Sequence, residues 1–373
     1  MKHPLLKTAL LIGSGWLATL AGLAHAVEVK FEAVSPGVYA FVGETGGRTY
    51  ANEGLNANIG LVVTPAGALL VDSGASLQGA RQIHEAVKRV TTQPVKWVIN
   101  TGGQDHRWLG NGYFQAQGAE VMAHANARAD MLNRGNDHLQ ALKGELKEKL
   151  DGTVPSLPTR FLSGNDETLN LGGLTVEVKH RGGAHTPGDV MVWLPQQRVV
   201  FSGDVVYVDR MLGVIPVSHT GRWLDSFAAL EALQPARIVP GHGQVSELAR
   251  AQADTRNYLQ ALRTHMKKAV EDGTDIGAAI RSCDAAPFMR LLNAAELHPG
   301  NASRTLYASP AYLVQHGTPQ TPNELARHHL IGNSKAPSMN QWQRHDNKAP
   351  WAVKGQSLTD NSAVMLTLVR HGV

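Results

Sequence analysis

The sequence of 373 residues lacks the features that mark several classes of protein. Its only cysteine is Cys283, so an exported chain would contain no internal disulfide. No run of lysines or arginines accompanies the formal net charge of +4, so the charge pattern does not indicate nucleic-acid binding. We find no internal repeat and no low-complexity tract, which argues against a solenoid. With 43% hydrophobic residues, the chain suits one large globular domain or two ordinary ones.

The first 26 residues have the organisation of a secretory signal peptide. Lys2 and Lys7 precede an apolar segment from about Thr8 to Leu23, and Ala24-His25-Ala26 supplies the small residues of a cleavage site. The alternative is a membrane anchor, but the apolar run is short for a span and is interrupted by glycines. We therefore expect a periplasmic or secreted protein, cut after Ala26, with no stable membrane insertion after cleavage.

Short apolar strands alternate with amphipathic segments through most of the mature chain. Residues Gly60 to Gly74 contain two β-rich runs joined at Pro65-Ala66-Gly67, which predicts a hairpin. Apolar positions at helical spacing predict a helix over Leu77 to Val90, and Val95 to Asn100 is the next predicted strand. Each strand ends in a polar, glycine-bearing loop. This order is typical of an α/β layered protein with its site at the strand ends.

Four of these strand-end loops contain the residues that bind metals in hydrolases. They are Asp105-His106, His185 with Asp189, Asp204, and His242. Hydrolytic zinc sites use imidazole nitrogens and carboxylate oxygens and leave one coordination position for water. The four loops together therefore predict a metal centre.

The order of these motifs resembles that of the metallo-β-lactamase superfamily. In that family a strand ends in Asp, and Asn-Thr-His-x-His-x-Asp-His-x-x-Gly-Asn, Gly-His-Thr-x-Gly-Asp, Thr/Ser-Gly-Asp and Pro-Gly-His-Gly follow. The similar segments here are Asp72, Asn100 to Asn111, Gly183 to Asp189, Ser202 to Asp204, and Pro240 to Gly243. The resemblance covers roughly residues 31 to 304 and implies an αββα four-layer sandwich, with metals at one edge of the two packed sheets, in a domain of residues 27–305.

The stretch "NTGGQDHRWLGN" departs from the family pattern. With Thr101 and Gly110-Asn111 held in register, Gly102 and Gln104 take the first two His positions, His106 takes the Asp position and Arg107 the last His position. A second alignment keeps Asp105-His106 on the family's Asp-His, at the cost of one inserted residue, and puts Thr101 and Gly103 on the His positions. Both alignments lack the two imidazoles of the first metal site.

The number of remaining ligands predicts one metal ion and not two. The first site would keep His185 and the bridging Asp204, with Gln104 as a weak oxygen donor, which is fewer than three good ligands. The second site would have Asp204, His242, and His106 or Asp105, with an open position. We expect zinc there, with iron as a second candidate metal.

In the interpretation with one metal ion, the neighbouring residues have further roles. His185 would be a free imidazole for proton transfer, Asp105 a further ligand or catalytic carboxylate, and Arg107 a cation that neutralises an anionic substrate group. Asp72 and Asp189 are better explained as carboxylates that orient the loops. In the alternative interpretation the scaffold persists without chemistry, and Asp105-His106 are ordinary polar residues of the loop.

The last part of the chain has a different character. Residues 306–373 resemble a fragment of the effector-binding domain of LysR-type regulators, on the segment "LYASPAYLVQHGTPQTPNELARHHLI". Neither the rest of that α/β domain nor a DNA-reading helix is present, so we expect a partial α/β fragment fused near residue 305.

Together these patterns predict an exported, metal-dependent hydrolase of a small ester, lactone, thioester or amide, with a β-lactam as one candidate substrate. The alternative is a non-catalytic periplasmic binding or accessory protein on the same scaffold. We expect a small molecule as the partner and no nucleic acid. The oligomeric state is left open.

Overall fold

A computed structural model describes residues 28–305, apart from residues 273 and 275, together with the backbone of four short strands in the C-terminal segment. The predicted signal peptide therefore lies outside the described residues. So does most of the fragment that resembles a LysR-type regulator, of which only β13 (Ile331–Asn333), β14 (Gln341–Trp342), β15 (Trp351–Ala352) and β16 (Ser357–Thr359) are described. The first of these strands pairs in parallel with β16, and β14 pairs antiparallel with β15.

The first sheet is built from the N-terminal strands in their sequence order. It runs β1 (Glu32–Ser35), β2 (Val38–Phe41), β3 (Ile59–Thr64), β4 (Gly67–Val71), β5 (Val95–Ile99), β6 (Glu120–His124) and β7 (Arg160–Leu162). Its first four strands are antiparallel and the later pairs are parallel. The predicted hairpin is confirmed, because β3 and β4 pair from Gly60–Val71 to Thr64–Gly67.

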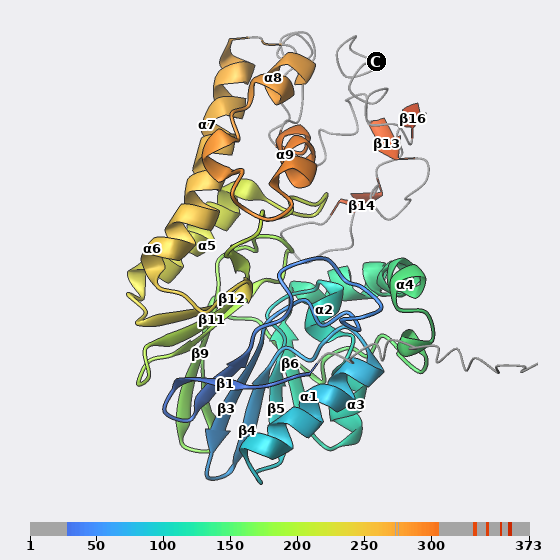
Figure 1. The fold of residues 1–373 in the computed structure, drawn as a ribbon, viewed down its shortest axis with the longest axis vertical. Coiled ribbons are helices and arrows are strands. Elements are labelled where there is room, and N and C mark those ends of the chain that lie inside the picture. The colour runs from blue at the N-terminus through green and yellow to red at the C-terminus, as the bar shows by residue number, and fades with distance from the viewer. Residues whose placement is uncertain are drawn as a thin grey trace, which may run out of the picture.

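The second sheet has five strands in the order β12 (Arg237–His242), β11 (Val199–Tyr207), β10 (Val190–Leu194), β9 (Leu174–His180) and β8 (Asp166–Leu171). Only the β11–β12 pair is parallel. Figure 1 shows the two sheets side by side, with helices on the outside of each.

Successive side chains of the buried strands point to opposite faces of their sheet and so divide the core into layers. In β4, Leu69 and Val71 join the cluster between the sheets, whereas Ala68 and Leu70 face the helices outside the first sheet. In β11, Phe201 faces the inter-sheet core and Val200 faces outward. Because successive side chains of a strand point to opposite faces, strands covered on both sides are apolar throughout. The predicted αββα four-layer architecture is thereby confirmed.

Helices of the first half cover the outer face of the first sheet. These are α1 (Leu77–Val90), α2 (Asp105–Trp108), α3 (Asn111–Ala116), α4 (Ala127–Leu146) and the 3₁₀ turn η1 (Lys147–Leu150). The bounds of α1 match the sequence prediction, and its N-cap is Ser76, whose hydroxyl accepts from the amide of Gly79 at 3.0 Å. Its buried face, with Ile83 and Val87, packs on the sheet.

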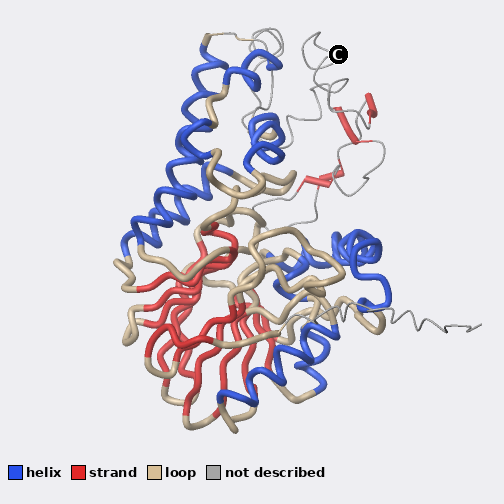
Figure 2. The backbone as a smooth tube through the Cα atoms, viewed as in Figure 1, coloured by secondary structure: helices blue, strands red, loops and turns tan. Residues whose placement is uncertain are grey.

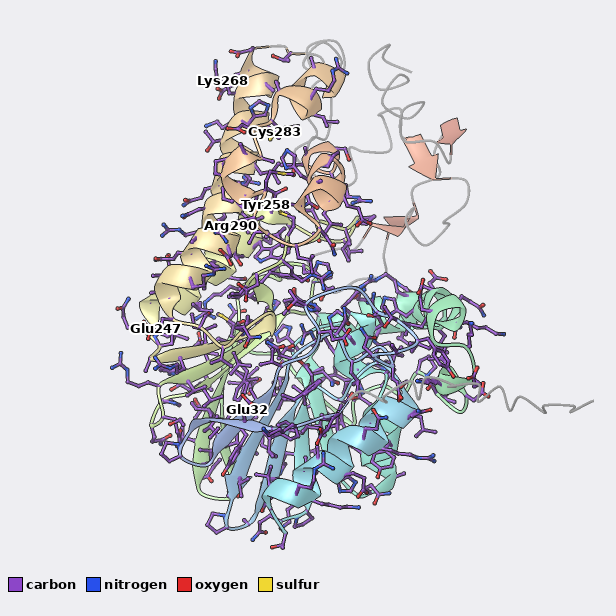
Figure 3. All side chains as sticks on the ribbon, viewed as in Figure 1. Glu32, Glu247, Tyr258, Lys268, Cys283 and Arg290 are labelled. Atoms are coloured by element: carbon purple, nitrogen blue, oxygen red, sulfur yellow. The ribbon has the colours of Figure 1, made fainter. Side chains whose placement is uncertain are left out.

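The helices of the second half cover the other sheet and extend beyond it. They are α5 (Thr220–Ala232), α6 (Leu248–Ala251), the π-helical turn η2 (Gln252–Arg256), α7 (Asn257–Glu271), α8 (Ile276–Ser282), the 3₁₀ turn η3 (Ala286–Phe288) and α9 (Ala294–Ser303). Figure 2 shows α7 to α9 rising past the strands, and Figure 3 shows Tyr258 and Cys283 within this extension. The hydroxyl of Tyr258 lies 3.0 Å from Nδ1 of His298, which ties α7 to α9.

Within the described part of the chain, none of the helices combines the length and the apolarity needed to cross a bilayer.

Candidate metal centre

The strand-end loops named in the sequence meet at one edge of the sandwich. Asp72 follows β4 with a φ of 69°, a left-handed conformation that Asp tolerates better than most residues. There its carboxylate accepts from the amide of Thr101 at 2.7 Å and from its hydroxyl at 2.8 Å. These two bonds fix the start of the loop that leads into α2, where His106 lies. Asp72 thus orients the loop, as the sequence indicated.

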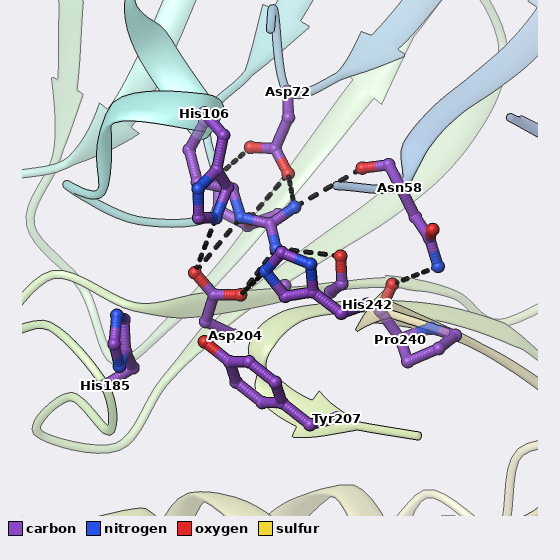
Figure 4. Close-up of polar contacts among 12 residues, drawn as sticks. Asn58, Asp72, His106, His185, Asp204, Tyr207, Pro240 and His242 are labelled. Atoms are coloured by element: carbon purple, nitrogen blue, oxygen red, sulfur yellow. Dashed lines mark hydrogen bonds and ion pairs between the residues drawn. The ribbon is translucent and has the colours of Figure 1, made fainter. Parts of the chain in front are cut away.

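Three side chains converge beside this loop, from α2, β11 and β12 (Figure 4). Nε2 of His106 lies 3.1 Å from Oδ2 of Asp204, and Nε2 of His242 lies 3.4 Å from Oδ1. The two rings are edge-on, with centroids 4.9 Å apart. All three residues are buried, and one ligand atom from each falls within 4.8 Å of the others. No other such group of three ligand residues occurs among the described residues.

Hydrogen bonds at the far side of each ring set the tautomer of these histidines. Nδ1 of His242 lies 2.8 Å from the carbonyl oxygen of Asn56, which can only accept. Nδ1 of His106 lies 3.1 Å from Oδ1 of Asp105. With a metal bound, a proton on each Nδ1 would satisfy these oxygens and leave both Nε2 lone pairs for the ion; without one, Nε2 of His106 donates to the carboxylate of Asp204. Partners of this kind orient the imidazoles in metal sites.

The protonation state also suits a metal. Burial holds the pKa of His242 well below its ordinary value, so the ring is neutral at pH 7 and its lone pair is available. Burial alone would raise the pKa of Asp204, but Arg107 and His106 beside it hold that pKa well below 3.8. Two imidazoles, of which that of His242 is neutral, and one carboxylate form a donor set that fits zinc.

The side chain of Arg107 lies in a position that was not predicted from the sequence. Its guanidinium spans two carboxylates, with Nη1 3.0 Å from Asp72 and Nη2 2.5 Å from Asp204. It also donates to the carbonyl oxygens of Gly241 and Asn58, and its side chain is 1% exposed. The predicted role of Arg107, neutralising an anionic substrate, was wrong because the side chain is enclosed and its donors are used. It neutralises the buried acids of the centre instead.

Residues 52–242, just over half of the sequence, match the family described as the metallo-beta-lactamase superfamily. The chain belongs to the metallo-β-lactamase superfamily. Its resemblance to that family in the sequence is thereby confirmed at the level of the superfamily.

Individual relatives are distant. The metallo-beta-lactamase type 2 of Bacillus cereus is 26% identical over 203 residues, which cover 53% of this chain and 71% of that protein. The 2,4-dinitroanisole O-demethylase subunit alpha of Nocardioides sp. (strain JS1661) is 25% identical over 178 residues, 47% of this chain and 49% of that subunit. Among solved structures, the metallo-beta-lactamase from Pontibacter korlensis superposes with a TM-score of 0.48 at 22% identity, over 60% of this chain and 95% of that one.

The positions where the superfamily pattern has its first two imidazoles are packed by other groups. A side chain on Gly102 would overlap the carboxylate of Asp189, which accepts from the amide of Thr186 at 2.7 Å and from its hydroxyl. Oε1 of Gln104 accepts from Nη1 of Arg134 at 3.2 Å. Arg134 is itself held by Asp130, at 2.6 and 2.7 Å. The space at this side is therefore filled by acids and a guanidinium.

His185 and Asp105, both predicted as ligands or catalytic residues, stand outside the group of three. Nδ1 of His185 lies 2.8 Å from the carbonyl oxygen of Gly213, and Nε2 has no hydrogen bond in the part of the chain that is described. Burial lowers the pKa of His185 to about 4. Asp105 accepts from a guanidinium group of Arg48 and from the amide of His106 at 2.8 Å. Its carboxylate is thus occupied in positioning, which explains why it does not face the other ligands.

Several residues around the centre were missed by sequence reasoning. Arg48 lies in the loop after β2, Asn56 comes just before β3, Arg134 is on α4, and Arg210 follows β11. None of them belongs to a motif, and their spacing carries no periodic signal. Only the fold brings them together.

Proposed function

We propose that the chain is an exported, metal-dependent hydrolase that uses one metal ion and acts on a small ester, lactone, thioester or amide, with a β-lactam as one candidate. The convergence of His106, Asp204 and His242, each with its ligand atom directed inward, is the observation that carries this proposal. Membership of the superfamily supports hydrolysis as the class of reaction. Export rests on the signal-peptide pattern of residues 1–26.

A count of one ion follows from the packing around Gly102. Of the two sequence alignments, the geometry favours the one without an insertion, because it places His106 at an acid-ligand position, beside Asp204 and His242. The same alignment puts Gly102 and Gln104 where imidazoles would complete another site. Neither offers a good ligand, and Asp189 fills the space next to Gly102.

The chain's own residues supply the rest of the chemistry. His106, Asp204 and His242 would hold a zinc ion, which when bound supplies a polarised carbonyl oxygen and an acidified water. We assign proton transfer to His185, whose Nε2 has no hydrogen bond among the described residues; its imidazole is neutral and, with a pKa of about 4, is a weak base. Arg107 keeps Asp204 ionised, and Asp105 and Asn56 fix the two ring orientations.

One observation favours the second candidate, a non-catalytic binding or accessory protein. The carboxylate of Asp204 is already neutralised by Arg107, so the centre is electrostatically satisfied without a metal. Such a protein would fold and bind a small molecule in the absence of zinc.

Metal analysis and turnover separate the two candidates. We expect the purified protein to contain about one zinc per chain and to hydrolyse members of a panel of ester, lactone, thioester and lactam substrates. His242→Ala should lose the metal and the turnover together, whereas His84→Ala, in a helix away from the centre, should keep both. Protein that retains no metal after zinc supplementation and turns over nothing in the panel contradicts the hydrolase.

A further inference from the structure

A cavity lies among the helices that cover the outer face of the first sheet. It is bordered by α1, by α3, which runs beside α1 in Figure 1, and by the segment of residues 152–156 that follows η1. Its volume is about 240 Å³, and none of the three candidate metal ligands lines it. An apolar cavity of about 150 Å³ is large enough to bind benzene. The cavity beside α1 can therefore hold a substituted benzene ring.

Two glycines on the walls keep side chains out of this space. A Cβ atom on Gly112 would lie 2.7 Å from the hydroxyl oxygen of Ser156, and one on Gly152 would lie 3.0 Å from Cδ2 of Leu77. Gly152 also has a φ of 76°, a left-handed conformation that glycine adopts without strain. The chain thus turns next to the cavity without filling it.

Hydrogen bonds fix the walls relative to one another. The backbone amide of Leu77 donates to the hydroxyl of Thr153 at 2.9 Å, which ties the start of α1 to the segment of residues 152–156. The side-chain amide of Asn111, at the start of α3, donates to the carbonyl oxygen of Ser156 at 3.2 Å. A ligand would therefore enter a preformed space and would not have to order these segments.

Most of the lining suits a flat, apolar ligand. Leu77, Leu109 and Val154 contribute aliphatic side chains, and Tyr113 contributes an aromatic ring. The side chain of Val154 is 65% exposed, so a ligand packed against it would remove apolar surface from water. Aromatic rings pack favourably against one another in offset or edge-on geometry. The lining therefore favours a ligand with an aromatic ring.

Two hydroxyl groups of the lining have hydrogen-bonding capacity left. The hydroxyl of Thr153 accepts from Leu77, and its proton has no acceptor among the described residues. The hydroxyl of Ser156 donates to the carbonyl oxygen of Val154 at 3.1 Å, and no donor within the described part of the chain reaches its oxygen. One free donor and one free acceptor match a hydroxyl group, which both donates and accepts.

We propose that this cavity is a binding site for a small phenolic compound, separate from the metal centre. The ring of the ligand packs against Tyr113, Leu109 and Val154, and its hydroxyl group binds to Thr153 and Ser156. Binding requires neither a metal ion nor turnover. The site is thus independent of the hydrolase proposed above.

Two probes of similar size test the chemistry of the site. They are 4-ethylphenol and ethylbenzene, which lacks the hydroxyl group. Calorimetry should show one 4-ethylphenol bound per wild-type chain. In Ser156→Ala the ratio of the affinities for 4-ethylphenol and ethylbenzene should fall by about 3- to 10-fold, because one hydrogen bond to the phenol is lost. The control Ser163→Ala removes an exposed hydroxyl outside the cavity and should leave the ratio unchanged.

A second set of variants tests the location. Val154→Trp places a large side chain over the cavity and should weaken 4-ethylphenol binding by about 10-fold or more. The matched control Leu132→Trp changes another exposed apolar residue, on α4, and should bind as wild type does. His242→Ala should also bind as wild type does.

Three results would overturn the proposal. One is binding that persists in Val154→Trp and disappears in His242→Ala, because the phenol would then occupy the metal centre. The others are the absence of any heat of binding to wild type at millimolar 4-ethylphenol, and an affinity ratio that Ser156→Ala does not change.

Discussion

The two sides of the centre share one sheet edge but have opposite contents. On one side, His106 and His242 direct their Nε2 atoms at Asp204, and an oxygen behind each ring fixes its orientation. On the other side, where the superfamily pattern has imidazoles, there are Gly102 and Gln104 (Figure 4 shows His185 apart from the group). The edge thus has three candidate ligand residues on one side, and neither an imidazole nor a carboxylate at residues 102 and 104 on the other.

The side with Gly102 and Gln104 is closely packed by other residues. The carboxylate of Asp189 lies where a side chain on Gly102 would be, and that of Asp130 lies where one on Gly103 would be. The guanidinium of Arg134 then links Asp130 to Gln104. Close packing leaves little room for an imidazole at these positions, because the neighbouring carboxyl groups fill the space.

The largest effect is expected at Arg107, which pairs with both Asp72 and Asp204. Arg107→Met leaves Asp72 and Asp204 buried without their cation, so the free energy of unfolding of the metal-free protein should fall by about 3–5 kcal/mol. Zinc should restore part of it by pairing with Asp204. Urea unfolding with and without zinc measures both free energies.

The control Arg237→Met removes a largely exposed pair with Glu247 and should lower the free energy of unfolding by about 1 kcal/mol or less. Equal losses in the two variants would contradict the assignment.

Rebuilding the missing imidazoles is expected to have a smaller effect. Gly102→His with Gln104→His should lower the free energy of unfolding by about 1–3 kcal/mol, because the new side chain meets Asp189. The zinc content should stay at one per chain by elemental analysis. The triple variant with Asp189→Ala opens the space and is the matched control for the steric argument. Two zinc ions in the double variant would show that packing does not block the site.

A smaller effect is expected from the titration of Asp189, which should make the free energy of unfolding depend on pH. Burial and the charge of Asp204 raise the pKa of Asp189 from 3.8 to about 8. Between pH 3.8 and about 8, the folded chain holds a proton on Asp189 that the unfolded chain has released. The free energy of unfolding therefore falls as pH rises, by at most about 1.4 kcal/mol per pH unit. The slope for metal-free wild type between pH 5 and 8 should exceed that of Asp189→Asn. Parallel slopes would mean that Asp189 is ionised in the folded protein.

The sequence predicted the part of this centre that depends on position along strands. Periodicity predicted the β3–β4 hairpin and helix α1, and the motifs placed His106, Asp204 and His242 at strand or loop ends that meet at one edge. Such inferences succeed because strand ends in layered α/β folds lie together.

The sequence did not predict which charges are buried against each other. The sequence predicted that Arg107, next to a ligand position, would be available to a substrate. Its side chain instead points inward, where it is the cation that pairs with Asp72 and Asp204. Arg134 lies on α4 and Arg210 in the loop after β11, and no sequence pattern marks either of them. Contacts between distant segments are set by three-dimensional packing, and a single sequence does not encode them as a period or a motif.

The smallest effect is expected when His185 is substituted, because the affinity for zinc should change little. Its Nδ1 is held by Gly213 and its ring lies outside the group of three, so His185→Asn, which retains a donor, should change the zinc affinity by less than about threefold. The matched change His242→Asn removes a ligand atom and should abolish retention of zinc during dialysis. Competition with a chromogenic chelator measures the two variants side by side. If His185→Asn weakens zinc binding as much as His242→Asn does, the imidazole of His185 is a ligand and belongs to the metal centre together with His106, Asp204 and His242.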